Sequence, residues 1–245
     1  AGVDTSQVVF SDDMITPLAS VLVNRLTGSR TIITRKMQTP PSLTYEQKLK
    51  LDDLAERLIA SEEPVTILID GHEAEISEYL IKKLPNARVV MDGGSLRASN
   101  IKLAAWTDYF VVSEHFARDY MSYRSLSTEA EIKAALIELN KICRGEAFIT
   151  LGEKGCAFLK SGMLQIVPSW LCNAVDTTGA GDVFHGAFTY GVHYSWHIDN
   201  IILFASLTAA ISIEKKGVRE SMPDLAVVHH SLNSYERNLT QYFEE

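Results

Sequence analysis

The chain has 245 residues, of which 46% are hydrophobic and 22% charged, a composition ordinary for a globular protein and long enough for one large α/β domain. The formal net charge of −8 argues against nucleic acids and anionic membrane surfaces as partners, because both are bound through clustered positive charge. The three cysteines show no C-x-x-C spacing and no apolar run is long enough to cross a membrane, so we expect free thiols in a cytoplasmic protein.

Two β-rich runs near the N-terminus predict a hairpin. Residues 20–24 and 30–34 flank a turn at residues 26–29 that contains Gly28. Arg30 is the first residue after that turn.

From residue 43 onward, the apolar positions first recur with the period of a helix, which predicts a helix over residues 44–61. Short apolar runs then alternate with further helical patterns, one of which begins at a capping box on Thr128. The predicted strands cover residues 65–70, 89–92, 109–112 and 147–150.

This alternation predicts an α/β fold with a parallel, doubly wound sheet that carries helices on both faces. Ligands of such sheets bind beyond the carboxyl ends of the strands. We therefore expect the polar residues that close the strands to line the site: Asp70, His72, Asp92, Ser113, Glu114 and Thr150.

Residues 175–187, with the sequence V-D-T-T-G-A-G-D-V-F-H-G-A, are the most informative stretch. Gly179, Ala180 and Gly181 allow backbone N–H groups to approach an oxyanion, and the helix that follows adds partial positive charge at its N-terminus. Asp182 falls in the first turn of that helix. An anion-binding loop beside a carboxylate suits phosphoryl transfer, which depends on positioning and charge stabilisation.

Two better-known phosphate motifs are excluded here. A P-loop would need a Lys after Gly181, and a dinucleotide-binding fingerprint would need a third Gly where Phe184 stands. The simplest alternative is a Gly-rich turn that Asp182 caps.

The string D-T-T-G-A-G-D-V-F at residues 176–184 resembles the second signature of the ribokinase-like (PfkB) family of carbohydrate and nucleoside kinases. The order of elements is similar to that family from near residue 2 to residue 225. The resemblance implies ATP-dependent phosphorylation of a sugar-like alcohol. The resemblance further implies that Asp182 is the catalytic base and that the N–H groups of Gly179, Ala180 and Gly181 form the anion hole.

The resemblance also implies nucleotide contacts and a lid. The turn T-L-G-E-K-G at residues 150–155 resembles the family's turn near the nucleotide, which assigns nucleotide contacts to Thr150, Gly152 and Gly155. In the signature loop, Thr178 is a further candidate for a nucleotide contact. Residues 1–40 correspond to a small β-sheet lid, often also a dimer surface, over a binding core at residues 41–245, one domain overall. We therefore expect a homodimer.

Three polar residues are further candidates for the substrate or phosphate. Arg30 follows the lid turn, where the family points polar groups at the substrate or phosphates. Asp92 closes a strand, and His185 is expected on the same helix face as Asp182. For Arg30 the alternative is a solvated strand arginine, and for His185 it is ordinary packing.

A loop near the C-terminus resembles the family's G-A-x-x-S-x-P loop, which together with the aspartate segment holds a monovalent cation. The matching ligands here are Asp176 and Ser221, and they imply potassium, although Val218 replaces the small residue. The alternative is a helix cap with Gly217 in a left-handed conformation.

Magnesium is expected because kinases neutralise the developing phosphate charge with it. Many relatives carry N-x-x-E at the magnesium site. Ser113 and Phe116 replace the Asn and Glu of that motif, which leaves Glu114 as the candidate ligand.

Members of the family usually carry an early aspartate and a Gly-Gly motif, and this chain lacks both. Its first residues resemble the part of the family's sequence that follows those motifs. We expect that an N-terminal segment carrying these motifs is missing. Two alternatives stay open: a non-catalytic sugar- or nucleotide-binding relative, and a nucleoside kinase of the same family.

Overall fold

The computed structural model describes residues 3–8, 18–23, 30–35 and 42–232. The chain divides into two compact units, Ala1–Ser42 and Leu43–Glu245. Among the residues described, no helix is both long enough and apolar enough to cross a bilayer.

The first unit contains the predicted pair of strands. Strand β1 (Ala19–Val23) pairs antiparallel with β2 (Arg30–Thr34), so that Ala19 lies opposite Thr34. The strand pair is thus confirmed, while the predicted turn at residues 26–29 falls outside the described residues.

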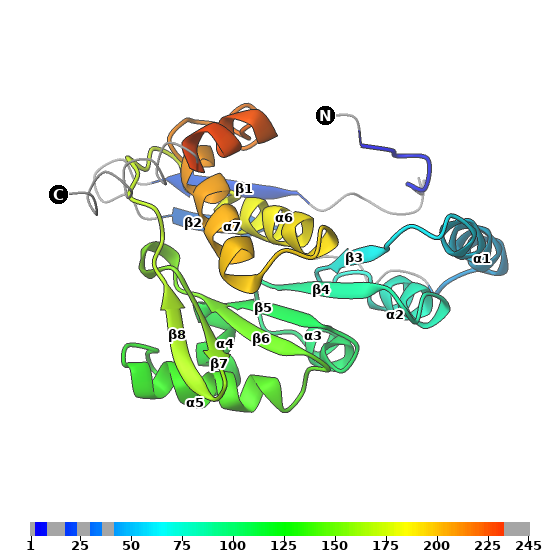
Figure 1. The fold of residues 1–245 in the computed structure, drawn as a ribbon, viewed down its shortest axis with the longest axis horizontal. Coiled ribbons are helices and arrows are strands. Elements are labelled where there is room, and N and C mark those ends of the chain that lie inside the picture. The colour runs from blue at the N-terminus through cyan, green and yellow to red at the C-terminus, as the bar shows by residue number, and fades with distance from the viewer. Residues whose placement is uncertain (1–2, 9–17, 24–29, 36–41, 233–245) are drawn as a thin grey trace. The chain divides into compact units, whose positions relative to one another are not determined.

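The second unit is built on one sheet with the strand order β3-β4-β5-β6-β7-β8 (Figure 1). Strands β3 to β6 run parallel, and β7 and β8 continue the sheet antiparallel. All four predicted strands of this unit are confirmed. The strands are β3 (Thr66–Ile69), β4 (Arg88–Gly93), β5 (Tyr109–Ser113), β6 (Glu146–Thr150), β7 (Cys156–Lys160) and β8 (Met163–Val167).

Helices begin largely where their caps predict. Thr44 and Thr128 each form a complete capping box, with Gln47 and Glu131 respectively, and so start helices after a polar residue. The helices are α1 (Tyr45–Ala60), α2 (Ala74–Lys83), α3 (Ala98–Ala104), α4 (Glu114–Tyr120), α5 (Glu129–Asn140), α6 (Ala180–His193) and α7 (Ile198–Ser212).

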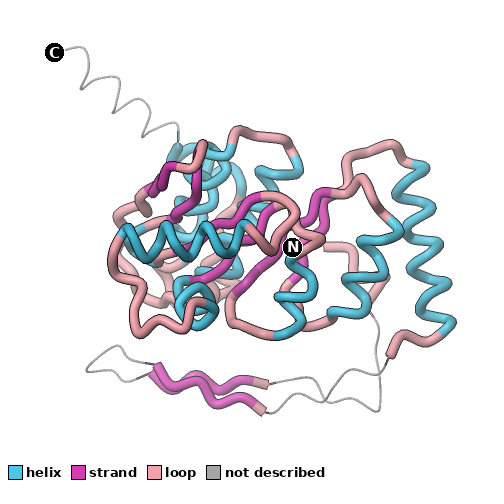
Figure 2. Tube along the Cα trace, turned by 90° about the horizontal axis from the view of Figure 1, so that it is seen from below, coloured by secondary structure: helices cyan, strands magenta, loops and turns pink. Residues whose placement is uncertain are grey.

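Helices cover both faces of the sheet, as Figures 1 and 2 show. Alternate strand residues point to opposite faces, so Val90 and Val111 pack with α6 and α7, whereas Met91 and Val112 pack with α3, α4 and α5. Because both faces are buried, these strands are apolar along nearly their whole length. The doubly wound fold is therefore confirmed.

The sheet also contains two strands that were not predicted, β7 and β8, which form an antiparallel hairpin. Ser161 and Gly162 connect them with φ angles of 52° and 75°, and two residues at positive φ make a turn whose twist matches a hairpin. Before β7, Gly155 has φ +102°, and a Cβ there would lie 2.0 Å from the Val167 carbonyl oxygen. The chain thus turns back beside β6 instead of crossing over through a helix.

Candidate active site

The loop before α6 has the shape that its glycines predict. Gly179 is the N-cap residue of α6 with φ +76°, and its carbonyl oxygen accepts a hydrogen bond of 2.9 Å from the Val183 N–H. The first N–H groups of a helix lack intrahelical acceptors and carry partial positive charge. Asp182 is exposed in the first turn, as predicted. The loop is therefore suited to an anion beside a carboxylate.

The three residues assigned to the anion hole differ in their surroundings. The Ala180 N–H donates a long turn hydrogen bond of 3.4 Å to the Thr177 carbonyl oxygen. A Cβ on Gly181 would meet nothing within 4 Å, whereas one on Gly179 would lie 2.5 Å from Val218 Cγ1. The role of these N–H groups as an anion hole stays a prediction.

Asp176 connects this loop to the segment after α7. Its Oδ1 accepts a hydrogen bond of 3.0 Å from the Thr178 N–H, and its Oδ2 accepts one of 3.3 Å from the Gly217 N–H. The N–H groups of Val175 and Asp176 both donate to the Ile213 carbonyl oxygen, at 2.7 and 3.1 Å. The two segments assigned to a cation therefore meet.

Ser221 and Gly217 lie in that second segment. Ser221 is buried, and its hydroxyl donates a 3.4 Å hydrogen bond to the Val218 carbonyl oxygen. Gly217 has the predicted left-handed conformation, with φ +88°, but α7 ends at a different cap residue, Ile213. The alternative that Gly217 caps α7 is wrong, because the helix has already stopped.

His185 and Asp92 meet on the inner side of α6. The His185 Nδ1 atom lies 3.3 Å from Asp92 Oδ2 and 2.7 Å from the Gly181 carbonyl oxygen, and Nε2 lies 3.1 Å from the Val111 carbonyl oxygen. His185 is only 3% exposed. His185 is therefore buried with polar partners at both ring nitrogens, and its role at the site stays a prediction.

Acidic groups surround Asp92 at the carboxyl ends of β3 and β4. Burial raises the pKa of Asp92 above its ordinary value of 3.8, the His185 ring opposes this, and Asp182 and Asp70 raise the pKa further. Asp70 and Asp92, which follow or end neighbouring strands, are therefore close enough to Asp182 of α6 for the three carboxyl groups to interact electrostatically around Asp92.

The raised pKa of Asp92 predicts a specific pH dependence of stability. The folded state binds the Asp92 proton more tightly than the unfolded state, so its contribution to the free energy of unfolding falls as pH rises from 3.8 through the folded-state pKa. Urea denaturation from mildly acidic to neutral pH should show this decline in the wild type and a shallower one in Asp92→Asn. Equal slopes in both proteins would contradict the raised pKa.

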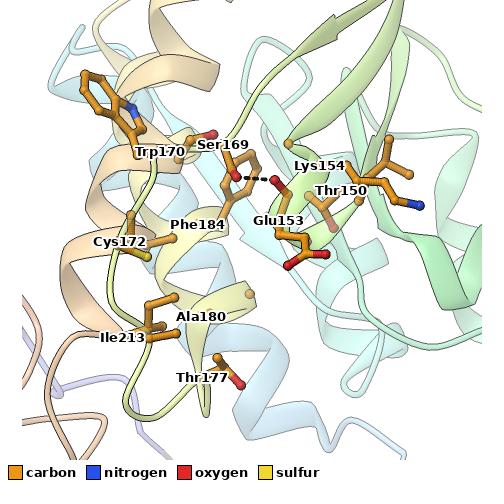
Figure 3. Close-up of a pocket in the computed structure, with 18 of the residues that line it drawn as sticks. Thr150, Glu153, Lys154, Ser169, Trp170, Cys172, Thr177, Ala180, Phe184 and Ile213 are labelled. Atoms are coloured by element: carbon orange, nitrogen blue, oxygen red, sulfur yellow. Dashed lines mark hydrogen bonds between the residues drawn. The ribbon is translucent and has the colours of Figure 1, made fainter.

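A cavity of about 790 Å³, a size common for small-molecule sites, opens beside the start of α6 (Figure 3). In Figure 3, Thr150 and Glu153 lie on one side, Cys172 and Ile213 on the other, and Thr177 near one end. Several residues predicted from the sequence line it: Glu114, Thr150, Gly152, Gly155, Ala180 and Gly181. Its lining does not include Thr178, Gly179, Asp182, Asp92 or His185.

One wall of this cavity was not predicted. It is largely apolar and comes from Trp170 and Leu171 before the loop and from Ala209, Ala210 and Ile213 at the end of α7. The Trp170 indole N–H donates a 3.1 Å hydrogen bond to the Leu203 carbonyl oxygen, which fixes this segment against α7. The same helix also carries Ala205 and Ser206, so its small residues gave no signal in the sequence for this wall.

The segment that departs from N-x-x-E has structural roles at two positions. The Ser113 hydroxyl accepts a 3.0 Å hydrogen bond from the Phe116 N–H, as the cap of α4, and donates one of 2.9 Å to the Gly94 carbonyl oxygen. Phe116 is fully buried and packs edge-on against Phe110. Glu114 lies between them in sequence and lines the cavity. A single carboxylate there fits magnesium, which proteins often hold through one or two carboxylates together with substrate phosphates.

Arg30 is the remaining candidate. It begins β2 in the first unit, and its side chain lies outside the part that the structure describes. Within the described ranges, no cluster of three or more His, Cys, Asp or Glu residues is arranged to hold a metal ion.

Comparisons with known proteins agree with this geometry. The model of the pfkB family carbohydrate kinases matches residues 1–225. A ribokinase of Lactococcus lactis subsp. lactis is 29% identical over 189 residues, which are 77% of this chain and 60% of that protein. The chain spans about half the length of the first curated relatives it matches.

Solved structures share the fold. A ribokinase from Giardia lamblia superposes with a TM-score of 0.75 at 20% identity, covering 89% of this chain and 72% of its own. The Arabidopsis thaliana ribokinase complexed with ribose and ATP gives a TM-score of 0.70 at 20% identity, covering 89% and 69%.

Proposed function

The chain belongs to the pfkB family of carbohydrate kinases, and we propose that it transfers the γ-phosphoryl group of ATP to a hydroxyl group of a sugar or sugar-like alcohol. One observation carries the proposal most directly. Asp182 is exposed on the first turn of α6, next to the left-handed Gly179 and a nucleotide-sized cavity. A base, an anion-binding loop and a nucleotide site are the parts that phosphoryl transfer requires.

In the proposed reaction, Asp182 accepts the proton of the attacking hydroxyl as its oxygen bonds to the γ-phosphorus in line with the departing ADP. The N–H groups of Gly179, Ala180 and Gly181 stabilise the negative charge on the transferred group. Asp92, at the same end of the sheet, is proposed to accept hydrogen bonds from further hydroxyl groups of the substrate, and Arg30 is proposed to assist from the lid.

The nucleotide is proposed to occupy the cavity. Its base lies against the apolar wall of Trp170 and Ile213, and its phosphates point toward Ala180 and Gly181. Thr150, Gly152 and Gly155 are the proposed contacts along its length, and Thr178, which does not line the cavity, is proposed as a further contact. Bound magnesium supplies charge neutralisation for the phosphates, and Glu114 is the residue proposed to hold it.

Several finer features remain proposals of the same kind. Potassium is assigned to Asp176 and Ser221, residues 1–40 to the lid, and the protein to the cytoplasm as a homodimer. The relatives named ribokinase, deoxyribokinase and fructokinase favour a five- or six-carbon sugar as the acceptor.

The proposal is tested by measuring ADP release from ATP and magnesium, with and without potassium, across ribose, deoxyribose, fructose and adenosine. We expect turnover with at least one sugar and none with water alone, and calorimetry should show ATP binding. Turnover with adenosine alone would indicate the nucleoside kinase. Bound ATP without turnover on any acceptor would contradict the kinase and favour a sensor.

A further inference from the structure

His185 has a hydrogen-bond acceptor at each of its two ring nitrogens. The Gly181 carbonyl oxygen lies 2.7 Å from Nδ1, and the Val111 carbonyl oxygen lies 3.1 Å from Nε2. With 3% of the residue exposed, bulk water has little access to the ring. The contacts of the ring therefore determine which of its nitrogens carry protons.

Carbonyl oxygens accept hydrogen bonds and cannot donate them. A neutral imidazole has one N–H, so it could satisfy only one of these two carbonyls and would set a lone pair against the other. An imidazolium has two N–H groups and satisfies both. The carboxylate of Asp92, whose Oδ2 lies 3.3 Å from Nδ1, supplies the opposite charge that a buried cation needs.

We propose that His185 is a positioning residue that acts as an imidazolium, fastening the Gly181 carbonyl to β5 and keeping Asp92 ionised beside Asp182. The functional part of this inference rests on the proposed kinase activity, while the protonation state of the ring does not. The ring joins three elements that each carry part of the site: the first turn of α6, the middle of β5 and the end of β4.

The charge of the ring matters because the rest of the surroundings disfavour a charge on Asp92. Burial raises the pKa of Asp92, and the His185 ring is the group that lowers it most. The charged groups facing the pair are Asp70 after β3 and Asp182 on α6, which raise that pKa, whereas β5 contributes the Val111 carbonyl. Without the imidazolium, Asp92 would hold a proton to higher pH and donate a hydrogen bond where it should accept one.

The protonation state is tested directly by ¹⁵N NMR of the full chain with labelled histidines. His197 is the internal control, because its Nδ1 lies 3.2 Å from Asp199 Oδ2 but its side chain is 65% exposed. At neutral pH we expect both ring nitrogens of His185 to carry protons, with slowly exchanging N–H signals that the exposed ring of His197 does not give. A neutral tautomer of His185 at neutral pH would overturn the inference, whether or not the protein is a kinase.

The functional part is tested with His185→Gln, which keeps one N–H donor but no charge. We expect kcat/KM of this variant to fall by about 100-fold, as for a misplaced catalytic group. We also expect the low-pH side of its plot of kcat/KM against pH, where activity is lost on acidification, to move to higher pH. The control is His193→Gln, at the far end of α6 where His193 contacts Thr66. It should keep the wild-type kcat/KM and the wild-type position of the low-pH side of the pH profile. A lower kcat/KM with an unshifted low-pH side of the profile would mean that His185 has only a structural role. It would overturn the inference that its charge keeps Asp92 ionised.

Discussion

Replacing Asp182 with Asn is expected to lower kcat by about a thousandfold, the typical contribution of a general base, while the fold and ATP affinity persist. The side chain is exposed on the first turn of α6, so the amide removes the proton acceptor without opening a cavity in the core. Initial rates of ADP release at saturating ATP and sugar, together with thermal unfolding, measure both parts of the expectation.

The matched control is Asp199→Asn. Asp199 is likewise an acid in the first turn of a helix, α7, and pairs at 3.0 Å with Lys160 on the surface. Because such exposed pairs contribute little, we expect this variant to keep wild-type rates. Wild-type turnover in Asp182→Asn, or an equal loss in both variants, would refute the assignment of the base.

Replacing Gly179 with Ala is the second change with a large expected effect. The residue has φ +76°, and the new Cβ would lie 2.5 Å from Val218 Cγ1. The left-handed conformation alone costs a residue with a Cβ about 1–2 kcal/mol, and the contact adds to it. Urea denaturation should show the loss of stability, and calorimetry should show weaker ATP binding because the loop at the start of α6 must shift.

Two further variants separate the causes. Gly186→Ala lies on the same helix in open space and should raise the free energy of unfolding by about 0.5–1 kcal/mol through helix propensity. Adding Val218→Ala to Gly179→Ala should recover the steric part of the loss but not the conformational part. If Gly179→Ala were as harmless as Gly186→Ala, the left-handed start of α6 would not be needed.

Features that depend on neighbouring residues could be predicted from the sequence. The capping box at Thr128, the strands that carry Asp92 and Thr150 near their carboxyl ends, and the turn into α6 at Gly179 follow from local patterns, and the structure has them. The β7–β8 hairpin was also local, since Ser161-Gly162 is a turn signal, but it was not predicted.

Features that depend on distant contacts could not be predicted in the same way. Ala209 and Ile213 read as ordinary core positions of an apolar helix, and only the packing of α7 beside the loop shows that they line a cavity. The sequence made His185 a candidate, but its partners Asp92 and Val111 come from strands far earlier in the chain. Phe116 shows the reverse case, because the position that the family resemblance matches to the Glu of N-x-x-E is buried core here.

The close approach of Val218 to Gly179 has a consequence for how this protein can change over evolutionary time. The valine occupies the space that a side chain at position 179 would need, and Asp176 joins the same two segments through the Gly217 N–H. Drift at positions 179 and 218 is therefore constrained jointly, and homologues with a bulkier residue at one should compensate at the other. A designer who alters the segment at residues 217–221 would in effect be redesigning the loop before α6 as well.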